Sequence, residues 1–163
     1  MEILTIKGGD LEERLDSGQM EDFEVLLRQY IEDVSAELPN IVNLNPPGGI
    51  RDVIQQVDML SVGGNPKFTD TYLLAVEGEY VVGILSFMAN EKRLFETHRV
   101  VLRDYRRRGI GKSLVKEFLT YARIFQADEC VFKNSTMAAY LSLIQAAKEE
   151  KLPYESKVVV KLD

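Results

Sequence analysis

The sequence has almost no residues from which a disulfide framework or a metal centre could be built. It contains one cysteine, Cys130, one histidine, His98, and no tryptophan in 163 residues. One cysteine cannot form an intrachain disulfide, and no cluster of cysteine and histidine has the spacing of a zinc site. These absences exclude a small disulfide-rich domain, predict that no metal ion is bound, and favour the reducing cytoplasm as the location.

Long apolar runs and an excess of positive charge are also missing. No stretch approaches the roughly 18 apolar residues of a membrane span, and the opening MEILTIKGGD lacks the apolar run of a signal peptide. The formal net charge of −6 argues against nonspecific binding to nucleic acid. We therefore expect neither a membrane nor a nucleic acid as partner. The length and the 45% hydrophobic content predict one domain over residues 1–163.

The hydrophobic pattern predicts an α/β protein with a mixed sheet. Apolar residues at helical spacing predict helices, and runs rich in β-branched and aromatic residues predict strands. The β-rich runs between residues 71 and 102 are separated by short turns, which is typical of an antiparallel meander. Helices are expected at residues 20–38, 50–61, 112–125 and 135–151, and strands at 2–7, 71–102, 129–134 and 154–162.

One stretch differs from the acidic composition: DYRRRGIGKSL, at residues 104–114, has three consecutive arginines followed by two glycines. It lies between a predicted strand and a predicted helix. The N-terminus of a helix presents unpaired N–H groups and a partial positive charge, and glycine lets the backbone approach an anion closely. The stretch therefore predicts a polyphosphate site.

The spacing excludes two common phosphate loops. A Walker A loop requires glycine at the position of Arg106, and the dinucleotide fingerprint requires glycine or alanine at the position of Leu114. The pattern that the residues match is R-x-x-G-x-G, formed by Arg106, Gly109 and Gly111. This motif, within VVLRDYRRRGIGKSLV, resembles the acetyl-coenzyme A loop of the GNAT N-acetyltransferase superfamily.

The resemblance extends to the order of helices and strands over nearly the whole chain. It implies a GNAT-like fold, with a mostly antiparallel twisted sheet of about six to seven strands flanked by about four helices. It also implies acetyl-coenzyme A as co-substrate, with the pyrophosphate held by the backbone amides of the loop. The arginine side chains would either neutralise the phosphates or form only a solvated turn. The coenzyme-binding residues expected on this basis are Val101, Leu102, Arg106, Arg107, Arg108, Gly109, Ile110, Gly111, Lys112, Ser113 and Asn134.

Acetyl transfer needs a proton acceptor, because only the neutral amine attacks a thioester. The resemblance implies that the base lies on the strand before the loop, where a backbone amide near Val101 would face the acetyl carbonyl. Glu96 and His98 are two residues apart on this strand and are expected on one face, as a pair that acts directly or through water. The alternative is that Glu96 pairs with Arg93 or Arg99 on a solvated sheet surface.

The acid that would protonate the leaving thiolate is marked less clearly. The family often places a tyrosine on the last helix, where this chain has Lys148 or Glu149. Tyr140, about two turns earlier, is the candidate acid, and its alternative role is core packing. Asn134 is expected to contact the pantetheine arm, to cap the last helix, or both. Cys130 is expected in the core, without a catalytic role.

The resemblance also implies that the early helices form much of the acceptor wall. Glu32, Asp33 and Glu37 give the first helix either a negative rim for a cationic acceptor or an ordinary solvated surface. We expect an acetyl-CoA-dependent N-acetyltransferase that transfers the acetyl group to a primary amine of a small molecule or peptide, directly within a ternary complex. The alternative is a catalytically silent acyl-CoA-binding or sensing module of the same fold. A monomer and a homodimer fit the sequence equally well.

Overall fold

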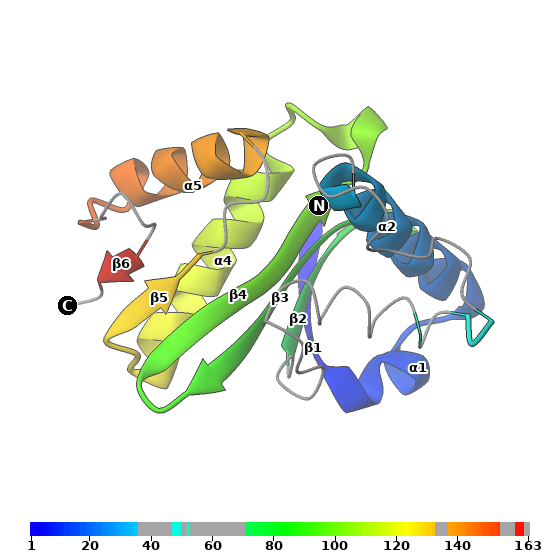
Figure 1. Cartoon of the computed structure of the whole chain (residues 1–163), viewed down its shortest axis with the longest axis horizontal. Coiled ribbons are helices and arrows are strands. Elements are labelled where there is room, and N and C mark those ends of the chain that lie inside the picture. Colours follow the sequence, from blue (N-terminus) through cyan, green and yellow to red (C-terminus); the bar gives the residue numbers. More distant parts are fainter. Residues whose placement is uncertain (36–46, 50–51, 53–70, 133–136, 154–158, 162–163) are drawn as a thin grey trace.

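The computed structural model describes residues 1–35, 47–49, 52, 71–132, 137–153 and 159–161. Figure 1 shows these residues as a sheet with helices on both of its faces. The elements in chain order are β1 (Glu2–Lys7), the short 3₁₀ helix η1 (Gly8–Asp10), α1 (Leu11–Arg14), α2 (Ser17–Ser35), β2 (Thr71–Glu77), β3 (Tyr80–Asn90), β4 (Arg93–Val101), the 3₁₀ helix η2 (Arg103–Tyr105), α4 (Ile110–Phe125), β5 (Glu129–Val131), α5 (Met137–Glu149) and β6 (Val159–Lys161).

The sheet has six strands in the order β1-β2-β3-β4-β5-β6. All neighbouring strands are antiparallel except β4 and β5, which pair in parallel over Arg93–Phe95 and Glu129–Val131. The rest of β4, from Glu96 to Val101, extends beyond the end of β5. Beyond Phe95, β4 therefore no longer pairs with β5.

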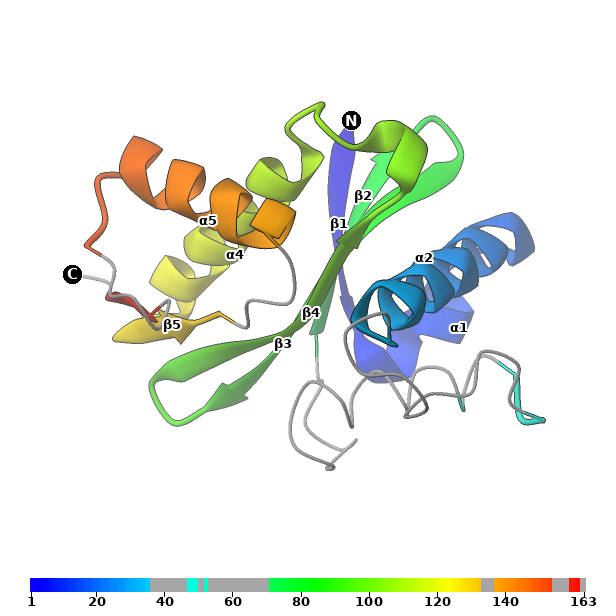
Figure 2. The same cartoon turned by 45° about the horizontal axis from the view of Figure 1, so that its top comes forward.

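The two faces of the sheet are covered by different helices, as Figure 2 shows. Helix α2 covers one face and buries Phe23, Leu26, Leu27, Tyr30 and Ile31 in a core with the β1–β3 side chains. Helices α4 and α5 cover the other face, and this second core contains most of the buried residues of α4. Burial is nearly continuous along β2, β3 and β4, because alternate side chains enter one core or the other. This two-sided burial explains why β2 and β3 are nearly continuous apolar runs.

Local chemistry explains where the helices begin. Asp16 and Gln19 form a capping box: the Asp16 carboxylate accepts the backbone N–H of Gln19 at 2.8 Å, and the Gln19 side-chain oxygen accepts that of Asp16 at 3.2 Å. Helix α2 therefore begins at Ser17 rather than at residue 20 as predicted. Gly109 has φ +80°, which lets α4 begin at Ile110, two residues before the predicted start. Gly83 of β3 lies under this helix start, because an added Cβ would come within 3.1 Å of Ile110.

The predicted fold class, the meander and the six- to seven-strand sheet are confirmed. Apart from Asp52, the predicted helix at residues 50–61 falls outside the described residues, and the short helix α1 occupies a stretch for which no helix was predicted. Strand β5 ends at Val131, before the predicted end of this strand at residue 134. The described part of the last predicted strand, Val159–Lys161, forms β6. Within the described part of the chain, no helix is long and apolar enough to cross a membrane, and no cluster of His, Cys, Asp and Glu could hold a metal ion.

Candidate active site

The loop that carries the R-x-x-G-x-G motif leads from the end of β4 through η2 to the N-terminus of α4. Gly109 occupies the position before the helix in a left-handed conformation, and no side chain caps the helix there. Arg107 also has a positive φ, of 64°. The first backbone N–H groups of a helix have no partner within it, so this turn presents donors and the positive end of the helix dipole. The arrangement suits an anion.

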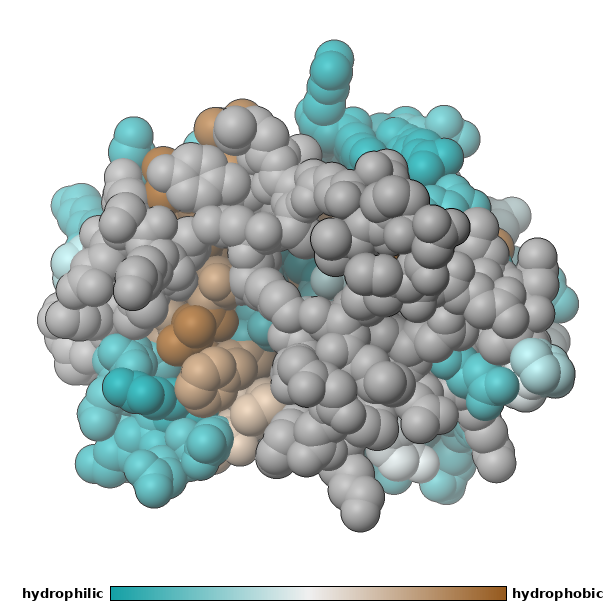
Figure 3. Space-filling model, in the orientation of Figure 1, coloured by the Kyte–Doolittle hydropathy of each residue, from teal (hydrophilic) through white to brown (hydrophobic). Residues whose placement is uncertain are grey.

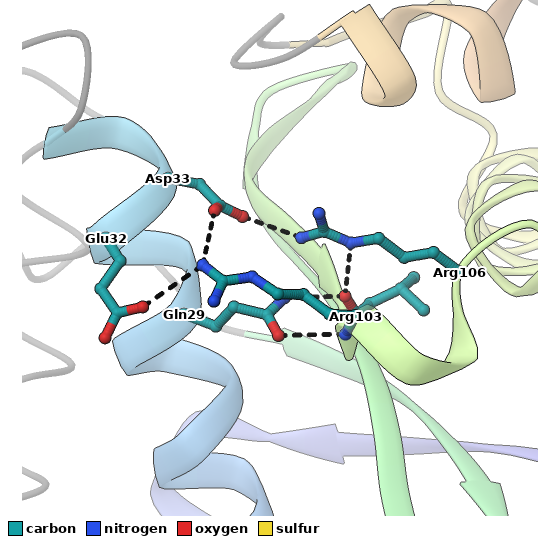
Figure 4. A network of polar contacts seen from close by, with 6 residues as sticks. Gln29, Glu32, Asp33, Arg103 and Arg106 are labelled. Carbon is teal, nitrogen blue, oxygen red and sulfur yellow. Dashed lines mark hydrogen bonds and ion pairs between the residues drawn. The ribbon is translucent and has the colours of Figure 1, made fainter.

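The arginines of this loop differ in their partners, as Figure 4 shows. Arg103 forms ion pairs with Glu32 at 3.3 Å and Asp33 at 3.2 Å, and Arg106 pairs with Asp33 at 2.8 Å. The hydrogen bond to Asp33 is the main cause that raises the pKa of the Arg103 guanidinium. The guanidinium groups of both arginines are thus directed toward α2.

Further cations lie along the start of α4. The guanidinium of Arg108 lies 4.8 Å from the centre of the Tyr105 ring, in cation–π range. Lys112 bonds to Glu149 of α5 at 2.9 Å, and Lys116 contacts the same carboxylate. The hydrogen bonds from Lys116 and Lys112 lower the pKa of Glu149. Both lysines of α4 therefore form ion pairs with the last residue of α5.

The expected carboxylate–imidazole pair on β4 does not form, and this is a correction. The register of β4 against β3 shifts between Ser86 and Phe87, so that Phe87 lies opposite Glu96 and Ser86 lies opposite His98, leaving Thr97 as the extra residue of a bulge. A bulge cancels the alternation by which residues two apart share a face. Glu96 therefore faces α4 and α5, whereas His98 faces α2.

Glu96 forms a buried ion pair with Arg99, at 3.3 Å between Oε2 and Nε, and the two side chains are 1% and 3% exposed. Arg99 also donates a hydrogen bond to the Ser142 hydroxyl of α5 at 3.1 Å. The ion pair with Arg99 was one of the two alternatives for Glu96, but it lies in the interior rather than on a solvated surface. Gly111 is adjacent, since an added Cβ would lie 3.6 Å from the Ser142 hydroxyl.

His98 lies on the α2 face among neutral groups. Its Nδ1 shares a hydrogen bond of 2.6 Å with Ser86, whose hydroxyl also contacts that of Thr97. The centre of its ring lies 5.6 Å from the centre of the Tyr30 ring and 5.9 Å from that of the Tyr72 ring. Burial lowers the pKa of His98 to about 3, so the imidazole is neutral at physiological pH. In the part of the chain that the structure describes, its Nε2 has no hydrogen-bond partner.

The remaining predicted residues are placed as follows. The backbone of Val101 and Leu102 lies at the end of β4, where Leu102 donates to the Val82 carbonyl at 3.0 Å. Tyr140 is part of α5, and Asn134 lies outside the described residues. Cys130 is buried in β5, and burial raises the pKa of its thiol to about 12, which keeps it protonated at neutral pH.

Three residues of this region were not predicted: Gln29, Arg99 as a buried cation, and Ser142. No motif marks them. Gln29 lies between Leu26 and Tyr30 on the buried side of the amphipathic helix α2, and it is 8% exposed. Burial of a glutamine requires polar partners, which lie about seventy residues away, so sequence spacing alone does not reveal them.

The surface over the strands is partly apolar. Figure 3, in the orientation of Figure 1, shows hydrophobic residues gathered over the strands and bordered by hydrophilic residues near the β3–β4 turn.

Comparison with known proteins decides the family. The family model described as "Acetyltransferase (GNAT) family" matches residues 51–149, which is more than half of the chain. The chain belongs to the GNAT acetyltransferase family. No curated protein matches the sequence.

Solved structures agree with this GNAT chain in fold at low sequence identity. An acetyltransferase from Brucella melitensis in complex with acetyl-CoA is 16% identical, with a TM-score of 0.51 and coverage of 99% and 96% of the two chains. A ribosomal-protein-alanine N-acetyltransferase from Brucella melitensis biovar Abortus 2308 is 15% identical, with a TM-score of 0.59 and coverage of 96% and 94%. An aminoglycoside acetyltransferase from an uncultured soil metagenomic sample, in complex with sisomicin, is 18% identical, with a TM-score of 0.58 and coverage of 96% and 91%.

Proposed function

We propose that the protein is an acetyl-CoA-dependent N-acetyltransferase that acts on a primary amine of a small molecule or peptide. The observation that carries the proposal is the uncapped N-terminus of α4 behind Gly109, at the end of β4, in a GNAT chain. Two similar structures were solved with acetyl-CoA or coenzyme A. Two others are an aminoglycoside acetyltransferase with sisomicin bound and a ribosomal-protein-alanine N-acetyltransferase, which supports an amine as the acceptor.

The pyrophosphate of the coenzyme would bind at the start of α4. The backbone amides of residues 107–112 supply the donors there, and Gly109 and Gly111 keep the backbone accessible. Ser113 already donates its backbone N–H to Gly109 at 2.9 Å, so its hydroxyl is the group available to the ligand. The apolar surface over the strands then suits the pantetheine arm.

The transfer would proceed directly between the two substrates. The neutral amine nitrogen attacks the thioester carbonyl carbon, the C–N bond forms, the C–S bond breaks, and the coenzyme leaves as a thiolate that takes up a proton. A backbone amide near Val101 is the proposed donor to the developing oxyanion. The high pKa and burial of Cys130 argue against an acyl-enzyme intermediate and support a ternary complex.

The proposed contacts with the amine come from the α2 face of β4. His98 is neutral and has an unpartnered Nε2, which can accept a hydrogen bond from the amine. Ser86 and Thr97, on the other side of the ring, extend this contact into a chain of hydroxyl groups. Tyr140 remains the proposed acid. Glu96, held by Arg99 on the opposite face, is proposed to act from the coenzyme side rather than together with His98.

The buried Glu96–Arg99 pair and the low pKa of His98 favour a second candidate, a silent acyl-CoA-binding module. Turnover separates the two functions. An enzyme releases free thiol from acetyl-CoA in the presence of one member of an amine panel, whereas a binding module shows affinity for acetyl-CoA with no thiol release for any amine.

The experiment that tests coenzyme binding is thermal unfolding with acetyl-CoA, ATP and NADPH in parallel. A ligand at 100 times its dissociation constant stabilises the folded state by about 2.7 kcal/mol. We expect a shift with acetyl-CoA and no comparable shift with ATP or NADPH. An equal shift with ATP would reduce the loop to a general anion site.

Gly109→Val and Gly78→Val form a matched pair for this experiment. Both glycines have a positive φ, +80° and +62°, with no atom near an added Cβ, but Gly78 lies in the β2–β3 turn. The backbone strain is therefore similar, whereas only Gly109→Val should abolish acetyl-CoA binding. Equal affinity of the two variants for acetyl-CoA would contradict the assignment of the loop.

A further inference from the structure

Helix α2 holds the segment that connects β4 to the motif loop, through polar side chains on one of its faces. Gln29, Glu32 and Asp33 come from α2, and Arg103 and Arg106 come from the segment after β4 (Figure 4). These contacts join parts of the chain about seventy residues apart. They lie directly before the turn in which we place the coenzyme pyrophosphate.

Gln29 uses both ends of its side-chain amide on the backbone of this segment. Its Nε2 donates to the Val101 carbonyl at 2.8 Å, and its Oε1 accepts the Arg103 N–H at 3.1 Å. Between these two groups, Leu102 donates to Val82 of β3 at 3.0 Å. Three consecutive residues are therefore fixed by hydrogen bonds from α2 on one side and β3 on the other.

Asp33 holds the same segment through charge. Its two carboxylate oxygens accept bonds from Arg103 at 3.2 Å and from Arg106 at 2.8 Å. Arg106 in turn donates from Nε to the Val101 carbonyl at 3.0 Å. The Val101 carbonyl thus receives two donors, one from Gln29 and one from Arg106.

The geometry points to Gln29 and Asp33 as positioning residues of the coenzyme site, with Arg106 as their link to the loop rather than as a phosphate ligand. This inference rests on the proposed function. The planar guanidinium of Arg106 donates from Nε to the Val101 carbonyl and from Nη2 to the Asp33 carboxylate. The ammonium group of a lysine cannot reproduce this two-pronged geometry. Its orientation fixes the backbone between Val101 and Gly109, whose amides must converge on the ligand. A displacement of about 1 Å in such a site can cost a hundredfold in rate.

The same contacts bear on the acceptor. Glu32 and Asp33 are counter-ions of the loop arginines, so they are not an open negative rim for a cationic substrate. Glu37, the third acid of the expected rim, lies outside the described residues.

The test compares Arg106→Lys with Arg106→Met by calorimetric titration of acetyl-CoA, at a temperature where both variants are folded. A phosphate ligand acts largely through its charge, so lysine would bind acetyl-CoA clearly more tightly than methionine, which has no charge. A positioning fork is lost in both variants, and we expect both to weaken acetyl-CoA binding about tenfold or more, to a similar extent. A lysine variant with nearly wild-type affinity beside a weak methionine variant would overturn the inference.

Variants on α2 test the positioning residues themselves. Asp33→Asn and Gln29→Met should each raise the KM for acetyl-CoA several-fold and lower kcat, with little change in the KM for the amine. Glu24→Gln is the control, because Glu24 pairs with Arg28 on the same helix away from the loop. If Gln29→Met does not fold, the partly exposed Asp33 still gives the decisive result.

The outcomes separate this inference from the proposed function. Wild-type protein that shows no shift with acetyl-CoA would remove both. Wild-type protein that binds acetyl-CoA, with α2 variants that bind it equally well, would remove only the positioning role.

Discussion

The two faces of β4 carry two buried polar clusters that differ in charge. On the α5 face, Glu96, Arg99 and Ser142 form an ion pair extended by a hydrogen bond. On the α2 face, His98 and Ser86 are neutral, and one imidazole nitrogen is without a partner. Glu96, His98 and Arg99 lie within four consecutive residues of β4, and the bulge at Thr97 separates the two clusters.

The difference concerns what each cluster can offer to a ligand. A buried ion pair supplies its own counter-charge, and removal of one partner costs stability because the other charge is left unpaired in the interior. A neutral group with a free nitrogen costs less to bury and can still form a bond with a ligand. We therefore expect changes on the α5 face to act mainly on stability, and changes on the α2 face to act on pH dependence and on the acceptor.

The largest effect should come from Glu96→Gln. This change leaves the Arg99 guanidinium, 3% exposed, without its carboxylate partner. Breaking a buried pair by removing one partner costs about 3–5 kcal/mol. We expect a loss of this size in the free energy of unfolding, measured by urea denaturation followed by circular dichroism.

Glu129→Gln is the matched control for that change. Glu129 pairs with Arg93, whose side chain is 61% exposed, and exposed pairs contribute about 0–1 kcal/mol. The double change Glu96→Leu with Arg99→Met should recover much of the lost stability, because both charges are then removed. A Glu96→Gln protein as stable as the wild type but without turnover would instead assign Glu96 to catalysis.

The second effect concerns His98 and pH. Its folded-state pKa, about 3, lies below the value of 6.5 for the unfolded chain. The stability that depends on the neutral imidazole is therefore fully present above pH 6.5 and is lost as pH falls from 6.5 toward 3. The expected slope is about 1.4 kcal/mol per pH unit.

His98→Gln checks this slope, since glutamine fills a similar volume and does not titrate. Denaturation of both proteins at pH 7.5, 6.0 and 5.0 should show the difference in stability between wild type and variant shrinking as the pH falls. A difference that is constant across these pH values would mean that His98 is not buried as a neutral group.

The sequence predicted the fold well because periodicity and turn signals are local. The meander, the helix after the loop and the glycine motif all follow from spacing within about fifteen residues. The bulge at Thr97 was missed, because a single extra residue in one strand depends on how that strand pairs with its neighbour. The strict alternation assumed for Glu96 and His98 therefore gave the wrong face for one of them.

The ion pairs of α2 show the same limit. Asp33 looks like a surface acid on its own helix, and Arg106 looks like a phosphate ligand within its motif. Their contact at 2.8 Å depends on α2 packing across the end of β4, which no local pattern encodes. The sequence therefore shows which residues are charged, but not which charges are already paired in the fold and which can still bind a ligand.

The smallest predicted effect compares two serines, one on each face of β4. Ser86→Ala removes the hydroxyl that bonds His98 at 2.6 Å, and Ser142→Ala removes the hydroxyl that bonds Arg99 at 3.1 Å. Each loss should cost about 1 kcal/mol of stability, the usual net contribution of one hydrogen bond. Their kinetic effects should differ, because only Ser86 orients the imidazole proposed to meet the amine. Ser86→Ala should lower kcat with acetyl-CoA affinity unchanged, whereas Ser142→Ala should leave kcat for the amine near its wild-type value. Equal effects of the two changes on kcat would contradict the proposal that the α2 face of β4, and not the α5 face, contacts the amine.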